Sequence, residues 1–262
     1  MVVFNNIIKL GELGCGCLSD IGKSLVFYYK VLLSFRHAKV QLQLVLKQTH
    51  YLGGCSLGVI VVAASFIGMV VSVQGFNTLA KFGAEAQLSQ LLALSVFREL
   101  GPVMTALLYA GRAGSALAAD IGLMQVTEQI PAMEVMAINP LNRVILPRWI
   151  AGFISLPLLT IIFNAVALVG GFLISIMWLH IDSGVFWSNM QSNVEFNTDV
   201  VYGIYKSIVF SLVINWMALY QGYTAVPNAS GVGMATTKTV VISSLLVLLL
   251  DFIMTAIMFG GL

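Results

Sequence analysis

Residues 48–80 read QTHYLGGCSLGVIVVAASFIGMVVSVQGFNTLA, and they contain no Asp, Glu, Lys or Arg. The stretch is bounded by Lys47 and Lys81. An α-helix needs roughly 20 apolar residues to cross about 30 Å of hydrocarbon. Because this stretch is longer than that, it predicts a membrane-spanning helix that tilts or projects beyond the bilayer.

The composition of the whole chain points the same way. Of the 262 residues, 59% are hydrophobic and 9% are charged, whereas a soluble domain has about 25% charged residues. A water-soluble fold of this size could not cover so much apolar surface with so few charges. The net charge of +2 and the lack of a basic run also argue against a nucleic-acid partner. We therefore expect an all-α integral membrane protein.

The positions of the charges divide the chain into an N-terminal segment, residues 1–47, and a domain of about five spans, residues 48–262. In the N-terminal segment charges recur every few positions among apolar residues at helical spacing, which predicts an amphipathic helix lying in the membrane interface. A helix packed on protein is the alternative. The spans are expected at about 50–80, 88–111, 149–180, 200–223 and 239–262.

The basic residues are distributed unevenly between the two sides of these spans. One side carries Lys81, and its loop from Asp182 to Asp199 is acidic. Cytoplasmic loops are the ones enriched in Lys and Arg, so the asymmetry predicts a cytoplasmic N-terminus and a C-terminus outside. Ten basic residues fall on the predicted cytoplasmic side: Lys9, Lys23, Lys30, Arg36, Lys39, Lys47, Arg112, Arg143, Arg148 and Lys238.

Four ionisable residues lie inside the expected spans: Arg98, Glu99, Lys206 and Asp251. Each costs roughly 3 kcal/mol at membrane depth, and their formal charges cancel. The pattern therefore predicts a paired polar cluster that faces the protein interior or a wet substrate path. Arg98 and Glu99 are adjacent, so they point about 100° apart and each needs a partner on another helix. A purely structural clamp between helices is the alternative.

A proline follows this pair closely. Pro102 has no backbone N–H to donate to the carbonyl of Arg98, four residues earlier. An unpaired carbonyl in the membrane is tolerated only where protein or water can satisfy it. The sequence therefore predicts a kinked helix at Arg98–Pro102.

One face of the first span is a candidate lining for a lipid. Val71, Gln74, Thr78 and Phe82 recur at helical spacing, with Leu79 beside them. A mostly apolar face with sparse polar atoms suits an acyl chain. Ordinary packing between helices explains the same pattern equally well.

The loop at about residues 123–147 is expected in the cytoplasm and carries a short apolar face. An apolar face in water favours a protein partner. The residues expected to take part in docking are Glu128, Met133, Glu134 and Met136.

No motif supports chemistry on this chain itself. Gly22-Lys23-Ser24 resembles the end of a phosphate-binding loop, but position 17, where the first glycine belongs, is a cysteine. The odd number of cysteines, with no His near Cys15 and Cys17, gives no basis for a metal site. We expect no metal, no cofactor and no enzymatic activity on this chain.

Several motifs together are similar to those of the MlaE-type permease family, over about residues 50–262. They are Arg98-Glu99-Leu100-Gly101-Pro102, Ala110-Gly111-Arg112-Ala113-Gly114-Ser115-Ala116, Ile121-Gly122-Leu123-Met124, Thr127-Glu128-Gln129, Met133-Glu134 and Asp251-Phe252.

The resemblance implies a permease subunit of an ABC system that moves phospholipid between the inner and outer membranes of Gram-negative bacteria and so maintains outer-membrane lipid asymmetry. It implies a homodimer, ATPase subunits that bind ATP and Mg, a cytoplasmic STAS-domain protein and a periplasmic ring of MCE-domain subunits. It also implies a coupling helix within residues 123–147 and a lipid cavity near the four ionisable residues. The alternative is an ion-coupled secondary transporter with Glu99 and Asp251 as proton carriers, although the chain lacks a matching pair of discontinuous helices.

Overall fold

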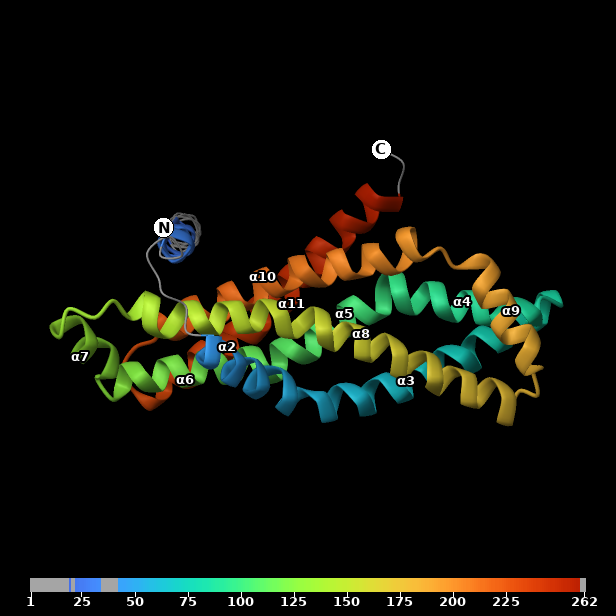
Figure 1. Ribbon diagram of the computed structural model, residues 1–262, viewed down its shortest axis with the longest axis horizontal. Helices are drawn as coiled ribbons and strands as arrows, with labels where there is room; N and C mark the ends of the chain where they lie inside the picture. The colour runs from blue at the N-terminus through green and yellow to red at the C-terminus, as the bar shows by residue number, and fades with distance from the viewer. Residues whose placement is uncertain (1–18, 20–21, 34–41, 260–262) are drawn as a thin grey trace, which may run out of the picture.

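The computed structural model describes residue 19, residues 22–33 and residues 42–259, and this part of the chain is helical without β-strands. Most helices run along one long axis (Figure 1). Two short helices, α7 (Gln129–Val135) and α9 (Ser183–Asn193), lie at opposite ends of the bundle (Figure 1). We call these ends the α7 end and the α9 end.

Five helical segments of the described chain are long and apolar enough to cross a membrane, which confirms the predicted number. They are Leu42–Phe82, Glu85–Val126, Leu141–Met177, Phe196–Tyr223 and Ala229–Met258. Between them they contain the helices α2 (Leu42–Thr49), α3 (Cys55–Leu79), α4 (Leu88–Ser95), α5 (Gly101–Tyr109), α6 (Ser115–Val126), α8 (Leu146–Met177), α10 (Val201–Tyr223) and α11 (Ala229–Phe259).

The helices extend beyond the expected spans at the α7 end. The first begins at Leu42, inside the segment 1–47, and the second continues to Val126 instead of ending near residue 111. Arg112 therefore lies within a helix and not in a loop. The physical reason is that a long basic side chain can reach toward the headgroups from inside a helix, so a charge does not mark the helix end.

Helix α8 occupies the middle of the bundle and packs against α2, α3, α5 and α10. Its crossing with α3 is close because both helices present glycine. A methyl group on Gly68 would collide with the backbone of Ala167, and one on Gly170 would lie 2.7 Å from the carbonyl oxygen of Ser65. Small residues of this kind let helices approach in a membrane, where van der Waals packing is a main attraction between them.

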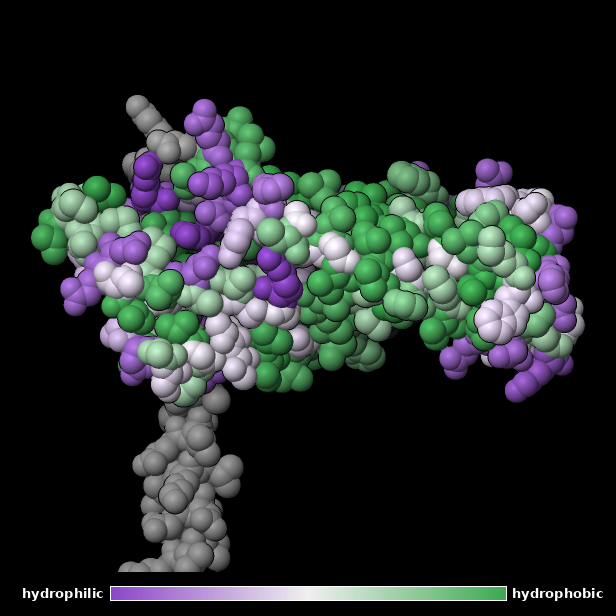
Figure 2. All heavy atoms as spheres, turned by 90° about the horizontal axis from the view of Figure 1, so that it is seen from below, coloured by the Kyte–Doolittle hydropathy of each residue, from purple (hydrophilic) through white to green (hydrophobic). Residues whose placement is uncertain are grey.

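On the face that Figure 2 shows, an apolar band covers the middle of the molecule, and hydrophilic residues gather toward both ends. This is the surface expected of a protein whose midsection faces hydrocarbon. Helix α11 contributes strongly, since only 11% of its most apolar window is buried inside the chain. Its exposed residues include Val241, Leu245 and Phe252. One side of α11 is therefore left for lipid or for another protein surface.

Residues 22–33 form a helix that crosses the bundle axis at the α7 end, where it is seen end-on in Figure 1. Phe27 packs on Tyr223 with ring centroids 5.4 Å apart, and Trp216 Nε1 donates to the carbonyl oxygen of Ser24 at 3.1 Å. Leu25 and Tyr29 stay exposed. A membrane-interface location for this helix remains a prediction.

Some residues named in the predictions lie outside the described part of the chain. They are Lys9, Cys15, Cys17, Arg36, Lys39 and the last residues of the fifth predicted span, 260–262.

Candidate functional site

The second span is interrupted by a π-helical turn at Val96–Leu100, which carries Arg98 and Glu99. The backbone N–H of Gly101 bonds to the carbonyl of Val96, five residues earlier. Pro102 follows and has no N–H to continue the α-helical pattern. The irregularity predicted here thus takes the form of one wider turn, a feature often found at functional sites.

Lys206 of α10 is the centre of a polar cluster inside the apolar band. Its Nζ atom donates to Glu99 Oε2 at 2.8 Å and to Asp251 Oδ1 at 2.9 Å. It also donates to Thr255 Oγ1 at 2.7 Å, and this hydroxyl donates onward to Glu99 Oε1 at 3.0 Å. We call Lys206, Glu99, Asp251 and Thr255 the Lys206 clamp. Of the four charges predicted to form one cluster, Glu99, Lys206 and Asp251 come together here, and they join spans two, four and five.

The clamp is buried on its basic side and open on its acidic side. The side chain of Lys206 is fully buried, whereas those of Glu99 and Asp251 are 37% and 20% exposed. All three ammonium hydrogens are engaged, and two carboxylates share one ammonium. A ligand that reaches this site therefore meets acceptor oxygens first, and an anion binds Lys206 only by displacing one of them.

The prediction that Arg98 belongs to this cluster is wrong, because Arg98 pairs with a nearer carboxylate, that of Asp199 in the turn before α10. Its Nε atom donates to Asp199 Oδ1 at 2.7 Å, and the second Asp199 oxygen accepts the backbone N–H of Glu195 at 2.9 Å. Asp199 is 1% exposed. The fourth span begins at Phe196, so Asp199 lies inside it and not in the acidic outer loop. A carboxylate one residue outside an expected span was the signal that could have identified it.

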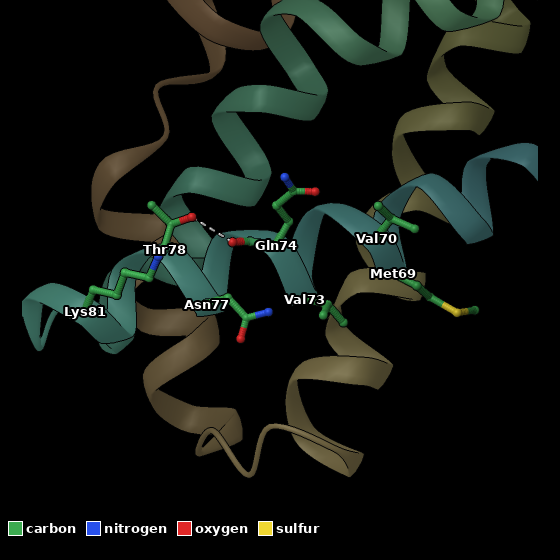
Figure 3. A pocket seen from close by; sticks show the side chains of 7 residues that line it. All are labelled: Met69, Val70, Val73, Gln74, Asn77, Thr78 and Lys81. Atoms are coloured by element: carbon green, nitrogen blue, oxygen red, sulfur yellow. Dashed lines mark hydrogen bonds between the residues drawn. The ribbon is translucent and has the colours of Figure 1, made fainter.

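Only some of the residues predicted to line a lipid path on the first span lie in one groove, and their contact with lipid remains a prediction. An open groove of about 510 Å³ runs along α3 (Figure 3). Gln74 and Thr78 belong to it, as do Met69, Val70, Val73, Asn77 and Lys81. Of the other predicted residues, Val71 packs against the core, Leu79 is half-buried and Phe82 is 80% exposed. Figure 3 shows Gln74 and Asn77 projecting from opposite sides of the helix.

The α3 groove and the Lys206 clamp are carried by different helices. Helix α3 packs mainly on α8, whereas α11 packs on α10, α6 and α5. Both features are open to the outside of the single chain. One chain by itself therefore does not enclose them in a common cavity.

The predicted docking loop contains the short helix α7 (Figure 1). Glu128 precedes it with a left-handed φ of 56°, and Ile130 anchors it with 2% exposure. Met133 turns toward the core, while Val135 and Met136 are 89% and 61% exposed. The exposed apolar face thus exists but is formed by the end of the helix.

Glu134 of α7 accepts a hydrogen bond from a residue of a neighbouring span. Its Oε1 atom accepts a hydrogen bond from the Tyr223 hydroxyl at 3.2 Å, and the Tyr223 carbonyl accepts one from Gln125 Nε2 at 2.8 Å. These contacts tie α7 to α10, the helix that carries Lys206. No group of three or more potential metal ligands (His, Cys, Asp or Glu) comes together among the described residues.

The sequence of this chain is similar to the sequences of known permeases. Residues 45–257 match the family described as Permease MlaE. The chain is 47% identical over 260 residues to the "Intermembrane phospholipid transport system permease protein MlaE" of Haemophilus influenzae, which covers 99% of this chain and 100% of that protein. It is 32% identical over 258 residues to a "Probable ABC transporter permease protein" of Rickettsia bellii, covering 98% and 99%.

A more distant relative comes from a plant. The chain is 32% identical over 232 residues to the chloroplastic protein TRIGALACTOSYLDIACYLGLYCEROL 1 of Arabidopsis thaliana, which corresponds to 88% of this chain and 66% of that protein.

The clamp predicts a specific pattern of stabilities. Lys206→Met should lower the free energy of unfolding by about 3 kcal/mol, because it leaves two carboxylates without their counter-charge. Adding Glu99→Gln and Asp251→Asn should restore much of this loss. Denaturant titration in detergent micelles measures the free energy of unfolding of each variant. The control is Tyr205→Met, a change at an exposed neighbour of Lys206 on α10. If the triple variant loses as much free energy of unfolding as the three single variants lose in sum, the charges are not coupled.

Proposed function

This chain belongs to the MlaE permease family, and from this premise we propose that it is the transmembrane subunit of an ABC transporter that moves phospholipids between the inner and outer membranes of a Gram-negative bacterium. The observation that carries the proposal is the Lys206 clamp. A phospholipid headgroup is polar, so its passage through an apolar bundle needs polar groups at membrane depth. The clamp supplies them on an open side of the chain.

The substrate site we propose combines the clamp with the α3 groove. The phosphate would exchange with a carboxylate for the Lys206 ammonium, because a charge-assisted bond to phosphate can replace one to carboxylate. Arg98 would bind the same headgroup only after leaving Asp199, which holds it away from the clamp in the single chain. Gln74, Thr78 and the apolar residues of the groove would contact the glycerol and acyl portions.

We propose that the working permease is a homodimer. Helix α11 is exposed along most of its apolar length, and the clamp opens beside it. A symmetric pair of chains would cover this surface and bring two clamps and two α3 grooves around one cavity. The cavity would then contain groups that a single chain leaves on separate helices.

The energy source is proposed to be a separate ATPase that binds ATP and Mg. Helix α7 and its exposed end would dock on this ATPase, and a STAS-domain protein would bind on the same side of the membrane. A periplasmic ring of MCE-domain subunits would meet the α9 end. The hydrogen bond from Tyr223 to Glu134 supports this arrangement, because it connects α7 directly to the helix that carries Lys206.

We place the protein in the inner membrane with its N-terminus in the cytoplasm and its C-terminus in the periplasm. Lys47, Arg143 and Arg148 line one pocket together with residues of α7, whereas Lys81 lies shortly before the turn Glu85–Gln87, which packs on α9. In a cysteine-free background, a cysteine at Ser188 should react with an impermeant thiol reagent from the periplasm, and one at Ala137 should not. The opposite labelling would reverse this orientation.

The coupling role of α7 predicts that Val135→Asp abolishes ATP-driven phospholipid transfer by the reconstituted complex. Val135 is 89% exposed, so the change should leave the fold intact while placing a charge in an apolar contact. Val226→Asp is the matched control, since Val226 is 60% exposed near the same end but outside α7. Unchanged transfer and ATP hydrolysis in the Val135 variant would show that α7 is not the docking element.

The same transfer assay distinguishes the ABC transporter from a second candidate function, that of an ion-coupled secondary transporter. Two carboxylates on one ammonium leave a negative charge that a proton could neutralise, as an ion-coupled transporter would require. Transfer driven by a proton gradient without nucleotide would support that mechanism. Transfer that requires ATP hydrolysis supports the ABC mechanism.

A further inference from the structure

The Lys206 clamp carries more negative charge than positive charge. Lys206 contributes one positive charge, whereas Glu99 and Asp251, which both accept its hydrogen bonds, contribute one negative charge each. The formal sum of the clamp is therefore −1. Thr255 adds a hydroxyl group and no charge. An unbalanced charge inside the apolar part of a membrane protein indicates that the site takes a ligand with a complementary charge.

Arg98 does not supply the missing positive charge. It is the one other Asp, Glu, Lys or Arg in residues 86–111, 200–223 and 239–262. Its Nε atom donates to Asp199 Oδ1 at 2.7 Å, and Asp199 is 1% exposed. This pair has no net charge, so including it leaves the sum of the site unchanged.

The positive and negative groups of the clamp differ in their access to a ligand. The Lys206 side chain is fully buried, whereas the carboxylates of Glu99 and Asp251 are partly exposed. Asp251 Oδ1 accepts from Lys206, but its Oδ2 atom accepts no hydrogen bond among the described residues. A carboxylate oxygen in this position can accept a hydrogen bond from a donor on a ligand.

This arrangement discriminates between phospholipid headgroups by charge. An anionic lipid would add its phosphate charge to the two carboxylates, and like charges repel strongly where the dielectric constant is low. A zwitterionic lipid adds no net charge. Its phosphate can replace a carboxylate at Lys206, and its ammonium can pair with the carboxylate that is displaced. The clamp therefore favours a headgroup that carries both charges.

A metal cation fits the same site poorly. Hard cations such as Ca²⁺ take six or more oxygen ligands in proteins. Among the described residues no third His, Cys, Asp or Glu joins Glu99 and Asp251. The Lys206 ammonium, 2.8 Å from Glu99 Oε2 and 2.9 Å from Asp251 Oδ1, would also repel a metal ion.

Starting from the proposed function, on which this inference rests, we propose that the Lys206 clamp selects zwitterionic phospholipids whose headgroup ammonium has N–H donors, as in phosphatidylethanolamine. The phosphate accepts a hydrogen bond from Lys206. The ammonium of the same headgroup donates to Asp251 and Glu99. Each charge of the headgroup then meets an opposite charge, and the formal sum of the site stays at −1.

The test is native mass spectrometry of the purified full-length chain with an equimolar mixture of phosphatidylethanolamine, phosphatidylcholine and phosphatidylglycerol that have identical acyl chains. Phosphatidylethanolamine should bind at least about tenfold more tightly than phosphatidylglycerol, because a hydrogen bond to a charged group is worth about that factor. Phosphatidylcholine should lie between them, because its quaternary ammonium has the charge but no N–H donor.

The variant Asp251→Asn assigns the preference to the clamp. It brings the formal sum to zero and keeps the pair of Lys206 with Glu99. The ratio of phosphatidylethanolamine to phosphatidylglycerol binding should fall roughly tenfold. A folding defect would instead weaken all three lipids alike and leave the ratio unchanged. Glu85→Gln is the matched control, because it removes an exposed carboxylate outside the clamp, and it should keep the wild-type ratio.

The possible failures are distinguishable. Equal binding of phosphatidylethanolamine and phosphatidylglycerol by the wild type, or a preference that persists in Asp251→Asn, would overturn the headgroup selection and leave the proposed phospholipid route intact. Phosphatidylcholine bound as tightly as phosphatidylethanolamine would overturn the role of the N–H donors. If the variant Glu99→Gln/Lys206→Met/Asp251→Asn binds all three lipids as the wild type does, the clamp is not the substrate site, and both proposals fail.

Discussion

The structure depends most on the burial of one ammonium group, that of Lys206, at membrane depth. Such a group is unfavourable in hydrocarbon unless acceptors surround it. Glu99, Asp251 and Thr255 supply these acceptors from spans two and five. Helix α11, whose most apolar window is little buried, is thereby tied to the rest of the bundle through Asp251.

The local structure around the clamp follows from the same requirement. The π-helical turn at Val96–Leu100 precedes Pro102 and presents Arg98 and Glu99 in different directions. Each then reaches a partner on α10 or in the turn that leads into it, Lys206 for Glu99 and Asp199 for Arg98. In the proposed function, a phosphate competes with the carboxylates for Lys206. Lipid binding would therefore loosen the link to α11 while it satisfies the ammonium.

The sequence was sufficient for the number of spans and for three members of the predicted four-charge cluster, because charges in an apolar chain have few places to be satisfied. It was insufficient for the helix ends, since Lys47 and Arg112 sit inside helices whose long basic side chains can reach the headgroups. Asp199 was missed because a shift of a few residues in a helix start decides whether a carboxylate is in water or in protein. The inward turn of Met133 required knowledge of how α7 packs on the core.

In the proposed function, phospholipid passes beside the Lys206 clamp. This route is tested most directly by ATP-driven phospholipid transfer in the reconstituted complex that carries Glu99→Gln, Lys206→Met and Asp251→Asn together. This neutral clamp keeps similar side-chain volumes and should still assemble with the ATPase and hydrolyse ATP. We expect phospholipid transfer to fall to a small fraction of the wild-type rate. Transfer at the wild-type rate by the neutral clamp would show that phospholipid does not depend on these charges for its passage.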